Sequence, residues 1–149
     1  SRGLGDVYKR QIQYNFQEEN IKMKETILLF NITDRNTKLK LERILLPLKL
    51  RIRRIPVSQY GQTLAALCGL EEPVALPSES VVTPSFSDPM MIFAGLSEMT
   101  LDRVLTGLRA QQIRIPYKAI LTSTNQHWTP EECFIEIKKE HEQMHGLNQ

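Results

Sequence analysis

The segment LTSTNQHWTPEE, residues 121–132, gathers several side chains that could hold a small polar ligand. Its candidate ligand-binding residues are Thr122, Thr124, Asn125 and Trp128. Hydroxyls and a carboxamide can donate hydrogen bonds to a carboxylate or phosphate. The same stretch has the pattern of a helix start, with Thr129 as the cap, a proline next and Glu132 three residues later. We therefore interpret it first as a turn and cap, and second as a binding rim.

Two further groups of polar residues follow apolar runs that we predict to be strands. Asn31, Thr33 and Asp34 come after ETILLFNI, and Gly95 and Ser97 come after MMIFA. In open parallel sheets, ligands bind beyond the carboxyl ends of strands, near the point where the strand order reverses. Helix N-termini at this position favour anions. We expect these residues to share one rim with the threonines of residues 122–124.

The sequence HEQMH, residues 141–145, places two histidines one helical turn apart with a glutamate between them. This is the spacing of the zinc peptidases, in which the glutamate is the general base. Those enzymes need a third protein ligand, normally downstream, and four residues follow His145. We predict a helix face here and no metal site.

Covalent catalysis has little support in the sequence. Cys68 and Cys133 stand singly in helical patterns rather than in a metal-ligand spacing. We interpret both as packed, reduced thiols. A serine follows Gly95, but the second glycine of a nucleophile elbow is missing. We expect no catalytic residue and no cofactor.

One stretch of the chain is rich in basic side chains. Its members are Lys38, Lys40, Arg43, Lys49, Arg51, Arg53 and Arg54. They could contact phosphates, but no nucleic-acid motif or aromatic platform accompanies them. The whole chain has a net charge of only +2, with 24% charged residues. We therefore predict a solvated helix face that runs into an edge strand, where charge discourages stray pairing.

Hydrophobic periodicity predicts the elements that must position these groups. Apolar runs indicate strands near residues 25–32, 50–57, 90–96 and 117–122. Helical spacing indicates helices from residue 35 to Leu46, where Pro47 stops it, from Ser58 to Gly69, after Ser97 and after Thr129. This alternation predicts an α/β domain of three layers, with helices on both faces of a mostly parallel four-stranded sheet. Order 2-1-3-4, as in flavodoxin-like folds, is favoured over a split βαβ arrangement. No internal sequence repeat is visible.

Length and composition fit a single domain. The chain has 149 residues, 41% of them hydrophobic. Residues 1–22 lack periodicity and resemble a translated sequencing adapter and leader ahead of Met23, so we expect a disordered, non-native tail and a domain over residues 23–149. No apolar run approaches the roughly 20 residues of a membrane span, and no secretory leader is visible. We expect a cytoplasmic protein. Residues 70–89 form a long loop, either ordered or mobile.

Several stretches together resemble a known family. PMMIFAGLSEMTLDRVLTGLR and IRIPYKAILTSTNQHWTPEECFIEIKKEHEQM are similar to a bacterial family catalogued as domain of unknown function 3783. KETILLFNI and LAALCGL extend the resemblance over residues 23–145, and the adapter-like start suggests a metagenomic source. No activity or site residue is established for that family, so the resemblance implies a domain boundary and no role for any residue.

Three functions are open at this point. The favoured one is a non-catalytic binding or regulatory module whose partner is a small anion or another protein. The second is a small-metabolite enzyme at the rim, with Asp34 or His127 as the acid–base group and Lys118 as an electrostatic helper. The third is a nucleic-acid accessory protein that uses the basic stretch. A deep pocket lined by Asp34, Ser97, Thr122 and Asn125 would favour the enzyme, and a shallow rim would favour the module.

Overall fold

The computed structural model describes residues 23–76 and 86–147, with the side chains of residues 145–147 left out of that description. The prediction of a non-native tail over residues 1–22 therefore lies outside the described residues. So does the middle of the long loop, residues 77–85.

Four strands form one mixed sheet in the order β2-β1-β3-β4, as predicted. The strands are β1 (Thr26–Phe30), β2 (Arg51–Arg54), β3 (Met90–Ala94) and β4 (Tyr117–Ile120). β1 pairs with β2 in parallel, and β3 pairs with β4 in parallel. The central pair, β1 with β3, is antiparallel. The mostly parallel sheet is thus confirmed, but its one antiparallel junction lies at the centre.

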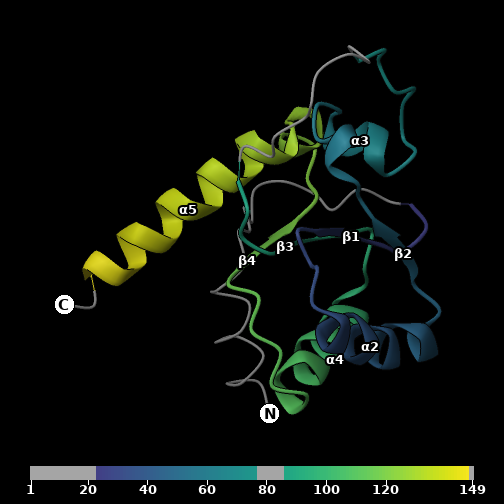
Figure 1. The fold of residues 1–149 in the computed structure, drawn as a ribbon, viewed down its shortest axis with the longest axis vertical. Coiled ribbons are helices and arrows are strands. Elements are labelled where there is room, and N and C mark those ends of the chain that lie inside the picture. Colours follow the sequence, from purple (N-terminus) through teal and green to yellow (C-terminus); the bar gives the residue numbers. More distant parts are fainter. Residues whose placement is uncertain (1–22, 77–85, 148–149) are drawn as a thin grey trace.

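Helices cover both faces of this sheet, which confirms the three-layer prediction (Figure 1). α2 (Arg35–Leu45) and α4 (Glu98–Ala110) lie on one face, and α3 (Leu64–Leu67) and α5 (Pro130–Leu147) on the other. α2 ends where predicted, since Pro47 falls in the short 3-10 turn Leu46–Leu48 that follows it. The predicted helix from Ser58 is wrong in its first half. A 3-10 turn, Val57–Gln59, comes first, and the α-helix begins only after Thr63, whose side chain accepts a hydrogen bond from the Ala66 N–H.

The two faces of the sheet build two hydrophobic cores, because successive strand residues point to opposite sides. Ile27 and Leu29 of β1 pack in the core under α2 and α4, whereas Leu28 and Phe30 pack in the core under α3 and α5. All five residues of β1 are buried, and so are all five of β3. Strands buried on both faces show no polar alternation, and this is why both read as continuous apolar runs.

The chain is built from two halves of the same architecture. The first half runs β1-α2-β2, a 3-10 turn and α3, and the second runs β3-α4-β4, a 3-10 turn and α5. The 3-10 turn Leu46–Leu48, between α2 and β2, has no counterpart in the second half. Leu28 faces Ile92 at the middle of the antiparallel pair, so the halves meet about a local two-fold relation there. A left-handed residue follows the first strand of each half, Asn31 at φ 58° and Gly95 at φ 73°. The repetition is structural, without a matching repeat in the sequence.

Candidate functional site

The predicted common rim does not exist, and the reason is the antiparallel pairing of β1 with β3. Phe30 pairs with Met90 at one end of the sheet, and Thr26 pairs with Ala94 at the other. The carboxyl ends of β1 and β3 therefore lie at opposite ends, separated by the length of a five-residue strand, about 16 Å.

The predicted site residues consequently fall into two groups. Asn31, Thr33 and Asp34 lie at the Phe30 end of the sheet, where β1 and β2 terminate. The others lie at the Ala94 end, where β3 and β4 terminate: Gly95, Ser97, Thr122, Thr124, Asn125 and Trp128. A single ligand cannot touch both groups, so the expectation of one rim at a parallel switch point is wrong.

The side chain and the backbone N–H of Asn31 form hydrogen bonds with three other parts of the chain. Its backbone N–H donates to the Tyr60 hydroxyl at 3.1 Å, and that hydroxyl donates to Asn31 Oδ1 at 2.8 Å. Asn31 Nδ2 donates to the carbonyls of Phe86 and Asp88, at 3.0 and 3.2 Å. Asparagine tolerates the positive φ required here better than most residues do. This side chain pins the returning end of the loop of residues 70–89 to the end of β1.

The outgoing end of the same loop is fixed by Gln62, which is buried. Gln62 Nε2 donates to the Val74 carbonyl at 2.7 Å, and the Val74 N–H donates to Gln62 Oε1 at 2.9 Å. Phe86 then stacks on Phe134 with ring centroids 4.6 Å apart. The described ends of the loop are therefore ordered, by partners that sequence reasoning missed. Local patterns could not reveal them, since Tyr60 and Asn31 are 29 residues apart.

Asp34 caps α2 and is exposed. Its Oδ2 accepts bonds from the Thr37 N–H at 2.9 Å and from the Thr37 hydroxyl at 2.8 Å. These two bonds hold the pKa of the Asp34 carboxyl below its usual value. A carboxylate already bound at a helix N-terminus fills the place that an anionic ligand would take. Asp34 is thus a poor general base, and the N-terminus of α2 is already occupied.

Gly95 and Ser97 serve the start of α4. Gly95 adopts φ 73°, and a Cβ added there would lie 2.6 Å from Met23 Cγ, so the position requires glycine. Ser97 Oγ accepts the Thr100 N–H at 3.1 Å. The Ser97 N–H donates to Glu25 Oε2 at 3.0 Å, which joins the start of α4 to the start of β1.

Asn125 closes the turn after β4 and is almost fully buried, with 2% of its surface exposed. Its Oδ1 accepts the Thr122 N–H and its Nδ2 donates to the Ile120 carbonyl, both at 2.8 Å. Thr122 Oγ1 accepts the Asn125 N–H at 3.1 Å. Buried polar groups need such partners, and these residues have them within their own turn.

The remainder of this segment begins α5. Thr129 and Glu132 exchange the bonds of a capping box: the Thr129 N–H donates to Glu132 Oε1 at 3.1 Å, and the Glu132 N–H donates to Thr129 Oγ1 at 3.3 Å. Trp128 is half-buried against the core, and its carbonyl accepts the Leu64 N–H at 2.8 Å, which ties the start of α3 to this turn. Thr124 is exposed. The turn-and-cap interpretation of residues 121–132 is the one that these bonds support.

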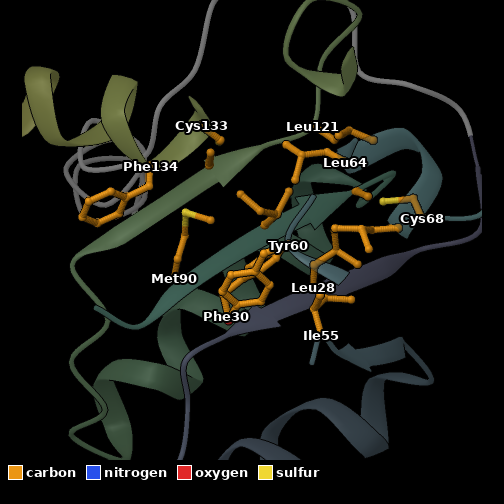
Figure 2. Close-up of a cluster of buried hydrophobic side chains, with 14 of the residues drawn as sticks. Leu28, Phe30, Ile55, Tyr60, Leu64, Cys68, Met90, Leu121, Cys133 and Phe134 are labelled. Carbon is orange, nitrogen blue, oxygen red and sulfur yellow. The ribbon is translucent and has the colours of Figure 1, made fainter. Parts of the chain in front are cut away.

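Both thiols lie in the core under α3 and α5, as Figure 2 shows for Cys68 and Cys133. Burial raises the pKa of Cys68 to about 11 and that of Cys133 to about 12. Both are free cysteines. A thiol that resists ionisation is a poor nucleophile, so these groups act as packing side chains.

Among the side chains that the structure describes, residues 23–76 and 86–144, no group of three or more His, Cys, Asp or Glu could hold a metal ion. The side chain of His145, the second histidine of HEQMH, lies outside that description. His141 lies against Tyr117, with ring centroids 5.3 Å apart. Lys118 Nζ donates to the Ile115 carbonyl, and burial lowers the pKa of this ammonium group.

The last four residues of the basic stretch lie along one side of the sheet, whereas Lys38, Lys40 and Arg43 belong to α2. Arg51, Arg53 and Arg54 belong to β2, one of the two outermost strands, and Lys49 precedes it. We call these four residues the arginine edge. Arg51 donates to the Cys68 carbonyl at the end of α3, and Arg54 pairs with Glu42 of α2. Lys49 and Arg53 are exposed and form no ion pair within the described part of the chain.

Two small hollows flank the end of β1. One, of about 190 Å³, lies between Thr33, Lys40 and Arg114, and the other, of about 160 Å³, lies between Thr33, Arg54 and Tyr60. Pockets for small molecules usually have about 300–1,000 Å³. Neither hollow reaches Ser97, Thr122 or Asn125. Only the second hollow contacts the arginine edge, through Arg54.

Comparison with known proteins identifies a domain in the second half of the chain. Residues 89–144 match the family model described as DUF3783, a domain of unknown function. The match begins one residue before β3 and ends within α5, so it covers one of the two halves of the fold. The resemblance seen in residues 23–88 lies outside this match. Neither the curated proteins nor the solved structures gave a match. No helix among the described residues is long and apolar enough to cross a membrane.

Proposed function

We propose that this protein, which carries a DUF3783 domain, is a non-catalytic cytosolic binding module that recognises an acidic protein segment at its arginine edge. The observation that carries the proposal is the arginine edge: three arginines on β2, one of the two outermost strands of the sheet, with Lys49 just before them.

The backbone of β2 supports an extended partner. The Arg51 N–H donates to the carbonyl of Glu25, just before β1, and the Ile55 N–H donates to the carbonyl of Leu29 in β1. In a parallel strand the bonding direction alternates from residue to residue, so the N–H and C=O groups of Ile52 and Arg54 point outward. No other strand pairs with β2 within the described residues. A peptide strand could add here through main-chain hydrogen bonds.

The side chains of β2 select the charge of that strand. Arg51 and Arg53 lie on the face of α3, because Arg53 pairs with Leu28 of β1, which packs in the core under α3 and α5, and alternate strand residues share a face. Acidic residues at alternate positions of a partner strand would lie opposite them, and such cross-strand pairs stabilise a sheet. A neutral or basic strand, including a second copy of β2, would leave the arginines unpaired or repelled. The positive charges of the arginine edge thus disfavour pairing with most strands and favour pairing with an acidic one.

Nucleic acid fits this surface less well. Two of the four cations are already engaged, Arg51 with a carbonyl and Arg54 with Glu42. No aromatic side chain belongs to β2 on which a base could stack. A small-metabolite enzyme has the least support. The polar residues predicted for its rim lie at two opposite ends of the sheet, and Asp34 is held ionised in the cap of α2.

The test is a binding measurement with labelled extended peptides. The probes are a peptide with glutamate at alternate positions, the same peptide with lysine instead, and a single-stranded oligonucleotide of equal negative charge. We expect the acidic peptide alone to bind, with its affinity falling about tenfold, or 1.4 kcal/mol, in Arg53→Glu. Arg103→Glu, a charge reversal at an exposed position of α4, is the matched control and should bind as the unaltered protein does.

Two results would overturn the proposal. One is equal binding of the acidic peptide by both variants, which would place any interaction elsewhere. The other is binding of the oligonucleotide in preference to the acidic peptide, which would support the nucleic-acid function instead.

A further inference from the structure

The side of α2 that lies toward β2 has apolar residues at its surface. Arg54 of β2 pairs with Glu42, which places this side of the helix beside the arginine edge. Leu39 stands three residues before Glu42 and Leu46 four residues after it, a spacing that puts them on the same side of a helix. Leu46 is the C-cap and keeps helical backbone angles. Leu39 is 44% exposed and Leu46 is 62% exposed, so two leucines lie at the surface next to β2.

Ile52 continues this apolar surface onto the strand itself. It pairs with Ile27 of β1 and packs at the margin of the core under α2 and α4, where it is only partly buried. Its N–H and C=O are among the backbone groups of β2 that point outward. We call Leu39, Leu46 and Ile52 the apolar margin. The apolar margin lies on the α2 face of β2.

The two faces of β2 therefore differ in chemistry. Arg51 and Arg53 lie on the face of α3, whereas Ile52 and Arg54 lie on the face of α2. The charge of Arg54 is balanced by Glu42. One face of the strand thus presents positive charge, and the other presents an apolar surface with a balanced ion pair.

We infer that the segment recognised at the arginine edge is amphipathic, an extended strand in which acidic side chains alternate with aliphatic or aromatic ones. This inference rests on the proposed function, because it describes the partner of the same edge. A strand that adds to β2 places its side chains on the two faces in turn. Its acidic residues then lie opposite Arg51 and Arg53, and the residues between them lie against the apolar margin.

Charge and apolar contact have different effects on this partner. Ion pairs at an exposed edge contribute little to affinity, because water and salt screen them. Removal of apolar surface from water contributes in proportion to its area, and most of the Leu46 surface is accessible to a partner. A segment of acidic residues alone would leave this surface in water. The arginines therefore select the acidic face of the strand, and the apolar margin supplies affinity.

An anionic lipid surface would also offer negative charge and apolar contact. It has no main chain, however, to pair with the outward-facing N–H and C=O groups of β2. A strand satisfies these groups as well as the two faces. The observations therefore favour a protein segment.

The experiment measures the binding of two labelled peptides of equal length and charge to the full chain. One alternates glutamate with valine, and the other alternates glutamate with serine. We expect the glutamate–valine peptide to bind about tenfold more tightly. Leu46→Ser removes apolar surface without adding charge, so it should remove most of this difference and leave the affinity for the glutamate–serine peptide unchanged. Met99→Ser, at a residue of α4 that is 65% exposed, is the matched control and should change neither affinity.

Leu39→Ser is a second variant of the apolar margin and should also narrow the difference between the peptides. Equal binding of the two peptides by the unaltered protein would overturn this inference and leave the proposed function standing. So would a preference for the glutamate–valine peptide that survives both serine variants. Binding of neither peptide would instead overturn the proposed function, and this inference with it.

Vesicles of phosphatidylserine and phosphatidylcholine are the third probe. We expect them to bind the protein less well than the glutamate–valine peptide does. A preference for the vesicles that is lost in Leu46→Ser would show that a lipid surface covers the apolar margin, and it would overturn the inference.

Discussion

Asn31 and Tyr60 are joined by two hydrogen bonds through a single hydroxyl, which accepts the Asn31 N–H at 3.1 Å and donates to Asn31 Oδ1 at 2.8 Å. The same hydroxyl belongs to a ring that lies 5.5 Å from the rings of both Phe30 and Phe86. This pair thus joins the end of β1, the turn after β2 and the end of the long loop. Asn31, which sequence analysis proposed as a ligand contact, thus stabilises the junction of these three segments.

Tyr60→Phe should therefore lower the free energy of unfolding by about 1–3 kcal/mol, because it leaves the Asn31 N–H and Oδ1 without their partner. The measurement is chemical denaturation of the unaltered protein and the variant. Tyr117→Phe serves as the control, since Tyr117 contributes ring contacts to Phe134 and His141. Equal stability of the two variants would contradict the role given to the Tyr60 hydroxyl.

Asn125→Ala should cost about 2–4 kcal/mol, since it removes a buried side chain that makes two hydrogen bonds inside its turn. Thr124→Ala, one residue away but exposed, should change the unfolding free energy by less than about 0.5 kcal/mol. Thermal unfolding of both variants provides the comparison. An Asn125→Ala protein as stable as the unaltered one would contradict the structural role of Asn125 and favour a ligand-binding role.

Gly95→Ala should destabilise the protein by more than about 2 kcal/mol. The φ of 73° is unfavourable for alanine, and the new Cβ would lie 2.6 Å from Met23 Cγ and 2.9 Å from the Met23 carbonyl oxygen. Gly61→Ala is the control, because its close neighbour is the movable end of the Leu76 side chain, at 2.9 Å. Denaturant midpoints should fall for Gly95→Ala and change much less for Gly61→Ala.

The two thiols should make stability fall at alkaline pH. Burial raises the pKa values of Cys68 and Cys133 from 9.0 to about 11 and about 12, so the folded state keeps protons that the unfolded state loses. Their contribution is fully present below pH 9 and declines as the pH rises through these folded-state values. The unfolding free energy measured against pH should fall less steeply in Cys68→Ala than in the unaltered protein.

The same burial predicts slow reaction with thiol reagents. At neutral pH the folded protein should react with a disulfide reagent far more slowly than the protein unfolded in denaturant, because the thiolate is the reactive species. Fast labelling of either cysteine in the folded protein would contradict the packed position assigned to it.

Much of this fold could be predicted from local sequence. The apolar runs of β1 and β3, the stop at Pro47 and the capping box of Thr129 and Glu132 are each set by residues within a few positions of one another. The strand order also followed, because two βαβ units give few ways to arrange four strands. These features depend on backbone chemistry that a short window of sequence contains.

Only the tertiary structure decided how the two halves meet. Both β1 and β3 are buried along their whole length, so their residues carry no alternation that would distinguish one strand direction from the other. A connection as long as residues 55–89 permits either direction, and packing of the two halves selected the antiparallel one. That single pairing placed Asp34 and Asn125 at opposite ends of the sheet. The sequence alone therefore determined most elements and their caps, with the start of α3 as an exception. Long-range packing determined which polar residues are neighbours.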